Sequence, residues 1–237
     1  MVDRWMIFAS AGLRAMAVGM SGVILAMYLV TLGLDAQAIG LSISLGLAGC
    51  ALGTFTVTLV ADHLGRRATL VLLAGFMVLG GVTMALAASA TVVMVGALVG
   101  MVNGMGRDRG PGLTVEQAML PQTTTESQRT AVFAWYNLVV DAGHAVGSLL
   151  GGLPAILRAH AGLQPLASYQ WTWGLYGALC LVAGLLVFRL SRSVELRGPA
   201  PTRRLSPTSR PVVAKFAALS ALDSFGGGFL TTALVSF

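Results

Sequence analysis

Ionisable side chains that could do chemistry are few in this chain, and several of them interrupt otherwise apolar segments. Only 10% of the 237 residues are charged, whereas 56% are hydrophobic. One polar row has intervals of four, three and four residues between its members, which are Asn137, Asp141, His144 and Ser148. On a helix this spacing places the four side chains on one face. Since histidine titrates near neutral pH, Asp141 and His144 could carry a proton; alternatively, they form a structural hydrogen-bonded pair that orients the helix.

A second polar group surrounds the segment Arg107-Asp-Arg-Gly-Pro-Gly112. Arginine binds carboxylate and phosphate groups through two parallel N–H donors, so this group suits an anionic ligand. If a helix continues through the segment, its polar residues fall on two faces. The glycines and proline instead predict a helix break that opens onto a cavity, or an ordinary cytoplasmic loop. The candidate members are Asn103 and Arg107 on one face, Arg109 and Glu116 on the other, and Arg14 inside the first apolar run.

The composition identifies the elements that must position these groups. A mean hydropathy of +0.80 and so few charges exclude a soluble globular domain and predict an all-α transmembrane chain. Because a charge in hydrocarbon is costly, each uncharged run is a candidate membrane span. The six expected spans are Trp5–Leu32, Asp35–Asp62, Ala68 to a turn at Ala88–Thr91, a short span from Thr91 to about Arg107, Thr130–Leu153 and Ser168–Leu190.

The same reading divides the chain into three parts. Residues 1–190 are expected to form a six-helix transmembrane domain, residues 191–211 an Arg/Pro/Ser-rich linker, and residues 212–237 the start of a seventh span. The net charge of +6 lies mainly in the predicted loops on one side of the membrane, so we expect no nucleic-acid partner. The positive-inside rule then places the N-terminus and the linker in the cytoplasm.

The turn between the second and third spans carries the motif Asp62-x-x-Gly65-Arg66-Arg67. It resembles the cytoplasmic signature G-x-x-x-D-R-x-G-R-R of the major facilitator superfamily, with Thr58 in place of the first glycine and His63 in place of an arginine. The resemblance implies that these four residues act as a conformational latch on the cytoplasmic side. The alternative is that the two arginines only anchor the turn at the membrane surface.

A second, weaker resemblance lies in the fifth expected span. Its glycines Gly143, Gly147, Gly151 and Gly152 follow the spacing of the antiporter motif G-x-x-x-G-P-x-x-G-G of the same superfamily, with Ser148 in place of the proline. Small residues at this spacing also allow two membrane helices to pack closely, with or without transport.

The resemblance implies the N-terminal half of a secondary transporter that moves a small solute by alternating access, plus the start of helix seven. Its partners are then the lipid bilayer, the solute, protons if transport is coupled, and the missing C-terminal half. An internal repeat aligns Arg14 with Asp223 on helix seven, and we expect these two charges to pair. The expected location is the bacterial inner (plasma) membrane, as a multi-pass protein.

Two other classes of function are alternatives to transport. One is a membrane scaffold or assembly fragment that transports nothing. The other is an intramembrane serine protease, in which Ser21 and His144 would be nucleophile and base as in rhomboid-type enzymes. Those enzymes carry the dyad on their fourth and sixth core helices, whereas here it would lie on the first and fifth spans. With no metal-ligand spacing and no nucleotide-binding loop, we expect no metal, no cofactor and no enzymatic activity.

Overall fold

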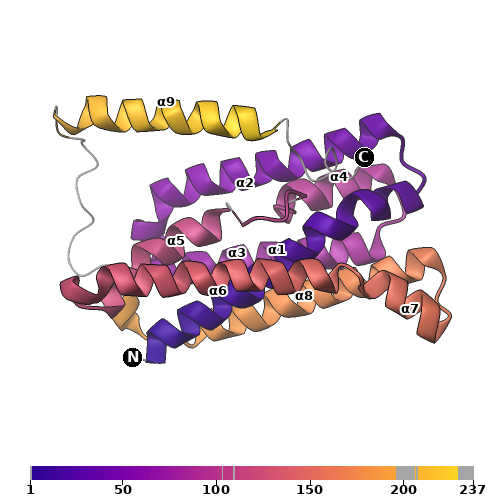
Figure 1. Cartoon of the computed structure of the whole chain (residues 1–237), viewed down its shortest axis with the longest axis horizontal. Helices are drawn as coiled ribbons and strands as arrows, with labels where there is room; N and C mark the ends of the chain where they lie inside the picture. The colour runs from indigo at the N-terminus through magenta and orange to yellow at the C-terminus, as the bar shows by residue number, and fades with distance from the viewer. Residues whose placement is uncertain (1, 103, 109, 196–205, 207, 229–237) are drawn as a thin grey trace. The chain divides into compact units, whose positions relative to one another are not determined.

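The regular elements of the chain are helices, as a computed structural model shows (Figure 1). The structure describes residues 2–102, 104–108, 110–195, 206 and 208–228, with side chains as far as Leu222. The expectation of an all-α membrane protein is confirmed for these residues. Three short 3₁₀ turns, η1 (Leu120–Thr123), η2 (Glu126–Gln128) and η3 (Arg192–Val194), accompany the α-helices. The α-helices are α1 (Val2–Thr31), α2 (Ala36–Leu64), α3 (Arg66–Leu86), α4 (Ala90–Val99), α5 (Pro111–Met119), α6 (Arg129–Leu150), α7 (Leu153–Ala161), α8 (Pro165–Phe188) and α9 (Ser209–Gly228).

Contacts divide the chain into two units, Met1–Arg197 and Gly198–Phe237. The first unit holds α1 to α8. The second unit holds α9, whose start is marked by Ser206: its hydroxyl accepts the amide N–H of Ser209 at 3.1 Å. Such a side-chain acceptor satisfies one of the amides that have no partner inside the helix.

Five helical segments among the described residues are long and apolar enough to cross a membrane: Val2–Thr31, Ala36–Leu64, Arg66–Leu86, Glu126–Ala161 and Pro165–Phe188. The ten-residue α4 is too short for this, since about 20 residues are needed. Figure 1 shows α4 and α5 one after the other along α2 and α3, and both contact these two helices. The expected fourth span is therefore a broken helix.

Apart from the end of the fourth span, the observed helix ends lie within a few residues of the expected ones. The turn between α3 and α4 is tighter than expected and covers residues 87–89. Ser89 ends it by accepting the amide N–H of Val92 at 3.4 Å. The short helix α7 was not predicted. It carries Arg158 and His160 in its last turn, where positive charge is favourable, and ends at Gly162 with a left-handed φ of 64°.

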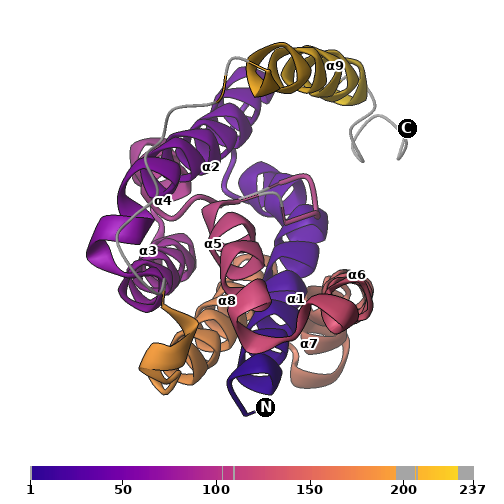
Figure 2. The same ribbon diagram turned by 90° about the vertical axis from the view of Figure 1, so that its left-hand side faces the viewer.

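Helix α1 is the central element of the first unit and packs against α6 and α8. Two apolar clusters surround it, one around Ile7 and Tyr136 and the other around Tyr28 and Trp173, and all four of these side chains are fully buried. Viewed along the bundle, α5 lies next to α1, α2 and α3, toward the middle of the unit (Figure 2). Arg14 lies within the first cluster, close to the point along α1 where the second begins, and is buried, so its charge is held inside the bundle.

The glycines of α6 explain the close approach of α6 and α1. A Cβ atom added to Gly143 would meet the carbonyl oxygen of Gly12 at 2.6 Å, and one added to Gly151 would meet Val23 at the same distance. A Cβ atom at Gly147 would overlap the carbonyl of Met16. Gly152 differs, because its nearest atom is the carbonyl of Leu149 in its own preceding turn.

Candidate functional site

Arg14 on α1 is the centre of a buried group of charges. Only 7% of this residue is exposed. Its Nε donates to Asp108 Oδ2 at 2.6 Å, while Nη1 and Nη2 donate to the two carboxylate oxygens of Glu116, the second at 2.8 Å. Such a two-pronged bond between guanidinium and carboxylate is among the strongest that side chains form. It ties α1 to α5 across the interior of the bundle.

Two further groups complete this arrangement, from α6. The hydroxyl of Tyr136 donates to Glu116 Oε2 at 2.7 Å, and the backbone amide of Asp108 donates to Nε2 of His144 at 2.9 Å. Since Nε2 accepts a hydrogen bond, the ring is neutral with its proton on Nδ1. We call Arg14, Asp108, Glu116, Tyr136 and His144 the Arg14 cluster.

Asp108 also shapes the chain on which it lies. Its second oxygen, Oδ1, accepts the amide N–H of Gly110 at 3.0 Å, just before Pro111 begins α5. An aspartate that bonds the amide two residues later forms a local turn and stops the helix from continuing. The same carboxylate therefore starts α5 and pairs with Arg14.

The charges of the Arg14 cluster do not balance. One guanidinium faces two carboxylates, so with both carboxylates ionised and His144 neutral the five side chains of the cluster sum to −1; Arg107, whose charge also acts on His144, is not counted among them. An uncompensated buried charge is unfavourable by several kcal/mol, which favours uptake of a proton or another cation. A cavity of about 40 Å³ adjoins the cluster and is lined by Ser10, Asp108 and Glu116 among others. This volume has room for roughly three water molecules, which could deliver a proton.

The broken fourth span changes the expectation for its polar residues. No helix runs through residues 100–110 in the part that is described, so the alternative of a continuous helix with two polar faces is wrong and the expected helix break is observed. Met101 and Gly106 have positive φ angles of 51° and 70°, which a right-handed helix cannot include. Arg107 is exposed on this connection. Asn103 and Arg109 lie outside the described residues.

Arg14 was predicted to pair with Asp223, but in the structure it is bonded to other residues. All three guanidinium nitrogens of Arg14 are bonded to Asp108 or Glu116. The side chain of Asp223 lies outside the described residues, so its contact with Arg14 stays a prediction.

The polar row of α6 is divided by the fold of the first unit. His144 is half-buried and reaches the Arg14 cluster, whereas Asn137, Asp141 and Ser148 are exposed. His144 therefore lies between an exposed carboxylate one turn away on its own helix and the buried carboxylate of Asp108. Whether the row carries a proton stays a prediction.

The Asp62–Arg67 turn connects three helices at one end of the bundle. Arg66 donates from Nε to Asp62 Oδ1 at 2.9 Å and from Nη1 to the carbonyl oxygen of Ala118 at 2.6 Å. It thereby joins α2, α3 and the end of α5. Gly65 has a φ of 93°, a conformation that residues with a Cβ rarely adopt, so the glycine of the motif is required for this turn.

Glu195 is a further member of this turn that the sequence did not reveal. Its carboxylate accepts the amide N–H groups of Arg66 at 2.7 Å and Arg67 at 3.0 Å, and so caps the N-terminus of α3. Arg67 donates to the carbonyl of Phe188 and lies 5.2 Å from the centre of that ring. The chain after α8 is thus fastened to the turn. A groove of about 180 Å³ with Thr58 in its wall adjoins Asp62 and Arg66.

Asp108 and Tyr136 were also missed as site residues. Tyr136 lies on the same face of α6 as Gly143 and Gly147, the face that the glycine spacing directs toward another helix. That pattern could have indicated its inward position. For Asp108, the sequence Asp-x-Gly-Pro is typical of a helix start, but nothing local indicated its pairing with Arg14.

The two residues of the protease alternative have other partners. The hydroxyl of Ser21 donates to the carbonyl of Val18 at 2.9 Å, and Nε2 of His144 accepts the amide of Asp108. The proton-accepting nitrogen of His144 is occupied and is not available as a base for Ser21.

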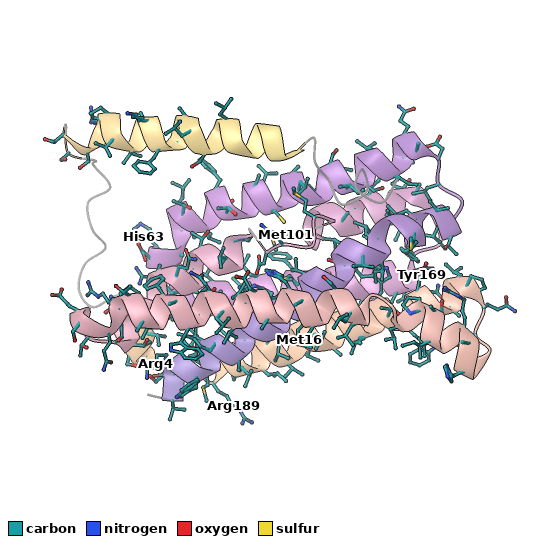
Figure 3. All side chains as sticks on the ribbon, in the orientation of Figure 1. Arg4, Met16, His63, Met101, Tyr169 and Arg189 are labelled. Carbon is teal, nitrogen blue, oxygen red and sulfur yellow. The ribbon has the colours of Figure 1, made fainter. Side chains whose placement is uncertain are left out.

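The ends of the bundle can be compared in Figure 3. Arg4, His63 and Arg189 lie at one end and Tyr169 at the other, with Met16 and Met101 between them. We call the first of these the Arg4 end. It holds the Asp62–Arg67 turn, and the Arg14 cluster lies away from it, deeper in the bundle.

Comparison with known proteins identifies the class. Residues 7–237 match the Major Facilitator Superfamily, and the chain belongs to this family of membrane transporters. A curated relative is "Uncharacterized membrane protein YJR124C" of Saccharomyces cerevisiae, 26% identical over 263 aligned residues that cover 97% of this chain and 59% of that protein.

Solved structures share the fold. The chain is similar to a bacterial homologue of the human drug peptide transporters PepT1 and PepT2, with 18% identity, a TM-score of 0.65, and coverage of 94% of this chain and 49% of that one. The chain is also similar to the peptide transporter POT in complex with sulfate, with 19% identity and a TM-score of 0.61. That match covers 92% of this chain and 44% of that one. The chain thus spans about half the length of these structures, and the likeness shows the fold alone.

Proposed function

We propose that the complete protein is a secondary active transporter that moves a small solute by alternating access, and that protons drive it. This chain supplies the N-terminal six-span bundle, residues 1–190, the linker, residues 191–211, and the start of a second bundle, residues 212–237. The family and the shared fold support the transport role. In such transporters the solute binds where two bundles meet, frequently at interrupted helices, and the α4–α5 break is an interruption of this kind.

The observation that carries proton coupling is the charge of the Arg14 cluster. A buried arginine between two carboxylates, with a net charge of −1, has a place for one proton. Glu116 is the proposed proton acceptor, because it is fully buried and the neutral acid would balance the cluster. His144 and Asp141 are the proposed route by which the proton reaches it from the exposed face of α6.

The charge of the solute follows from the same count. Arg14 is occupied by two carboxylates and offers no free edge to an anion, so the cluster supports a neutral or cationic solute better than the anionic one expected from the arginines. We still include anionic solutes in the test below, because Arg107 is exposed on the α4–α5 connection.

The orientation in the membrane is proposed from the loop charges. Arg4 and Arg189 are at the Arg4 end, and Arg67 bonds there to the carbonyl of Phe188. Arg158 and His160 lie in the last turn of α7, where Arg158 contacts Tyr169 at the other end. The positive-inside rule then makes the Arg4 end cytoplasmic. The motif at that end would act as a latch between conformations; its residues are Asp62, Gly65, Arg66 and Arg67. The proposed location of the protein is the plasma membrane.

Uptake by the complete protein in proteoliposomes tests the proposal. An imposed inward proton gradient should accelerate accumulation of at least one member of a panel of neutral, cationic and anionic solutes. Glu116→Gln should abolish the response to the gradient while exchange of solute across the membrane continues. The matched control is Glu126→Gln, since Glu126 is exposed and pairs only weakly, at 3.6 Å, with Arg129. Accumulation by Glu116→Gln that still follows the gradient would refute the coupling role.

A further inference from the structure

The bond between Asp108 and His144 links a titratable ring to the backbone of the broken helix. The donor is the amide N–H of Asp108 and the acceptor is Nε2 of His144, 2.9 Å away. A neutral imidazole has one acceptor nitrogen, whereas an imidazolium has two donors and no acceptor. No rotation of a charged ring can therefore preserve this bond.

We propose that His144 is a proton-operated switch for the α4–α5 connection, and that protonation of the ring releases the backbone around Asp108. This inference rests on the proposed function for its role in transport, but the release itself can be measured without transport. It gives His144 a conformational role in addition to any passage of protons.

The charged groups around His144 make its protonation a local event with a defined response. Asp108 and Arg107 approach it from the connection, Arg14 from α1, and Asp141 from its own helix. Burial and the two arginines oppose a proton on the ring, whereas the two carboxylates attract it. Once charged, the ring is attracted to the carboxylates and repelled by the backbone N–H of Asp108, from which Nε2 had accepted a hydrogen bond.

Loss of the bond between His144 and the Asp108 amide would disturb the α4–α5 connection. Asp108 is held from three sides: its amide by His144, one carboxylate oxygen by Arg14, and the other by the amide of Gly110. When His144 releases the amide, a buried N–H loses its acceptor and must find another. A shift of Asp108 that restores one would also disturb its bond to Arg14 and the start of α5.

The neighbouring α1 lies close against the backbone of His144 and of the α4–α5 connection. Gly22 of α1 lies directly against Gly106, so closely that a Cβ atom on Gly22 would overlap the backbone of Gly106. Gly19 of α1 lies in the same way against the backbone of His144. His144 and the connection thus rest on one surface of α1, which keeps the ring and the amide in register until the ring is charged.

Amide hydrogen exchange of the complete protein in detergent, followed by mass spectrometry, tests the switch. The readout is the protection of residues 100–112, corrected for the intrinsic effect of pH with an unstructured peptide of the same sequence. Between about pH 8 and pH 5, the range in which histidine changes charge, protection in the wild type should fall roughly two- to tenfold.

Three variants separate the switch from other effects of pH. His144→Gln places an amide oxygen near the position of Nε2 that accepts a hydrogen bond and does not titrate, so protection should stay high at both pH values. His144→Leu has no acceptor, so protection should be low at both. His160→Gln is the matched control, because His160 is exposed on α7 and, among the described residues, its ring contacts the carbonyl of Ile156 in its own helix; it should behave as the wild type.

The outcomes divide clearly. The inference is overturned if the wild type shows no loss of protection, or if His144→Gln loses protection as the wild type does. If protection changes as expected but uptake ignores the proton gradient, the proposed function fails and the switch remains. If uptake follows the gradient while His144→Gln leaves protection and its pH dependence unchanged, coupling remains and the switch fails.

Discussion

Replacing Arg14 by methionine removes the positive charge from the Arg14 cluster and keeps most of the side-chain volume. Asp108 and Glu116 are then buried carboxylates without a counter-charge, at 8% and 0% exposure. Removal of one partner from a buried ion pair destabilises a protein by about 3 to 5 kcal/mol. Because Arg14 serves two carboxylates, we expect Arg14→Met at the upper end of this range unless both take up protons.

At the same site, we expect Glu116→Gln to destabilise the protein less than Arg14→Met does. It keeps the shape of the side chain and an acceptor for Tyr136, and it brings the net charge of the cluster from −1 to zero. In the glutamine, however, an amide nitrogen faces one N–H of Arg14 in place of an oxygen, so one arm of the two-pronged bond is lost. A hydrogen bond to a charged group contributes about 1.5 to 3 kcal/mol, and we expect Glu116→Gln to lose stability in that range, less than Arg14→Met. The double variant Arg14→Met with Glu116→Gln should recover part of the stability lost in Arg14→Met.

Thermal unfolding in detergent, followed by the fluorescence of tryptophans such as the buried Trp173, measures the series at a fixed pH. The ordering that we expect is the wild type highest, Glu116→Gln below it, the double variant next, and Arg14→Met lowest. Acidification should narrow the gap for Arg14→Met, because the orphaned carboxylates become neutral. Equal loss of stability in Arg14→Met and Glu116→Gln would refute the charge count, since it would mean that the two carboxylates and Arg14 balance already.

Three further predictions use the same measurement. Tyr136→Phe removes a hydrogen bond to a buried carboxylate and should destabilise by about 1.5 to 3 kcal/mol, whereas Tyr176→Phe, whose hydroxyl has no hydrogen-bond partner among the described residues, should not. Gly147→Ala forces a methyl group into the backbone of α1 and should cost about 1 to 3 kcal/mol, but Gly174→Ala, with open space around it, should stabilise by about 0.5 to 1 kcal/mol. Glu195→Gln removes the charged cap of α3 and should cost roughly 0.5 to 2 kcal/mol; no change would show that the cap is not formed in solution.

Much of the fold could be predicted because membrane spans are encoded locally. Hydrocarbon excludes charge and demands that backbone groups bond within their own segment, so uncharged runs become helices whatever their neighbours are. The Asp62–Arg67 turn was predicted for the same reason, since charges must lie outside the hydrocarbon and Gly65 permits a φ that other residues rarely adopt.

The candidate site could be predicted only in part. Arg14, Glu116 and His144 were recognised one at a time, because an ionisable residue in a membrane span is unusual by itself. Their grouping was not recognised, and the expected partner of Arg14 was Asp223. A salt bridge depends on which helices are adjacent and how they are rotated, and that information lies in contacts between residues more than 90 positions apart.

The sequence by itself determined the membrane class, the approximate spans, the close glycine face of α6 and the motif of the Asp62–Arg67 turn, all of which follow from local chemistry. For the fourth span the sequence left a continuous helix, a break and a loop open, and the structure shows the break. The tertiary structure alone decided that Asp108 and Glu116 share Arg14, and that Glu195 caps α3. The physical reason is that a buried charge is tolerated only with a partner, and the partner is set by the packing of whole helices rather than by spacing along the chain.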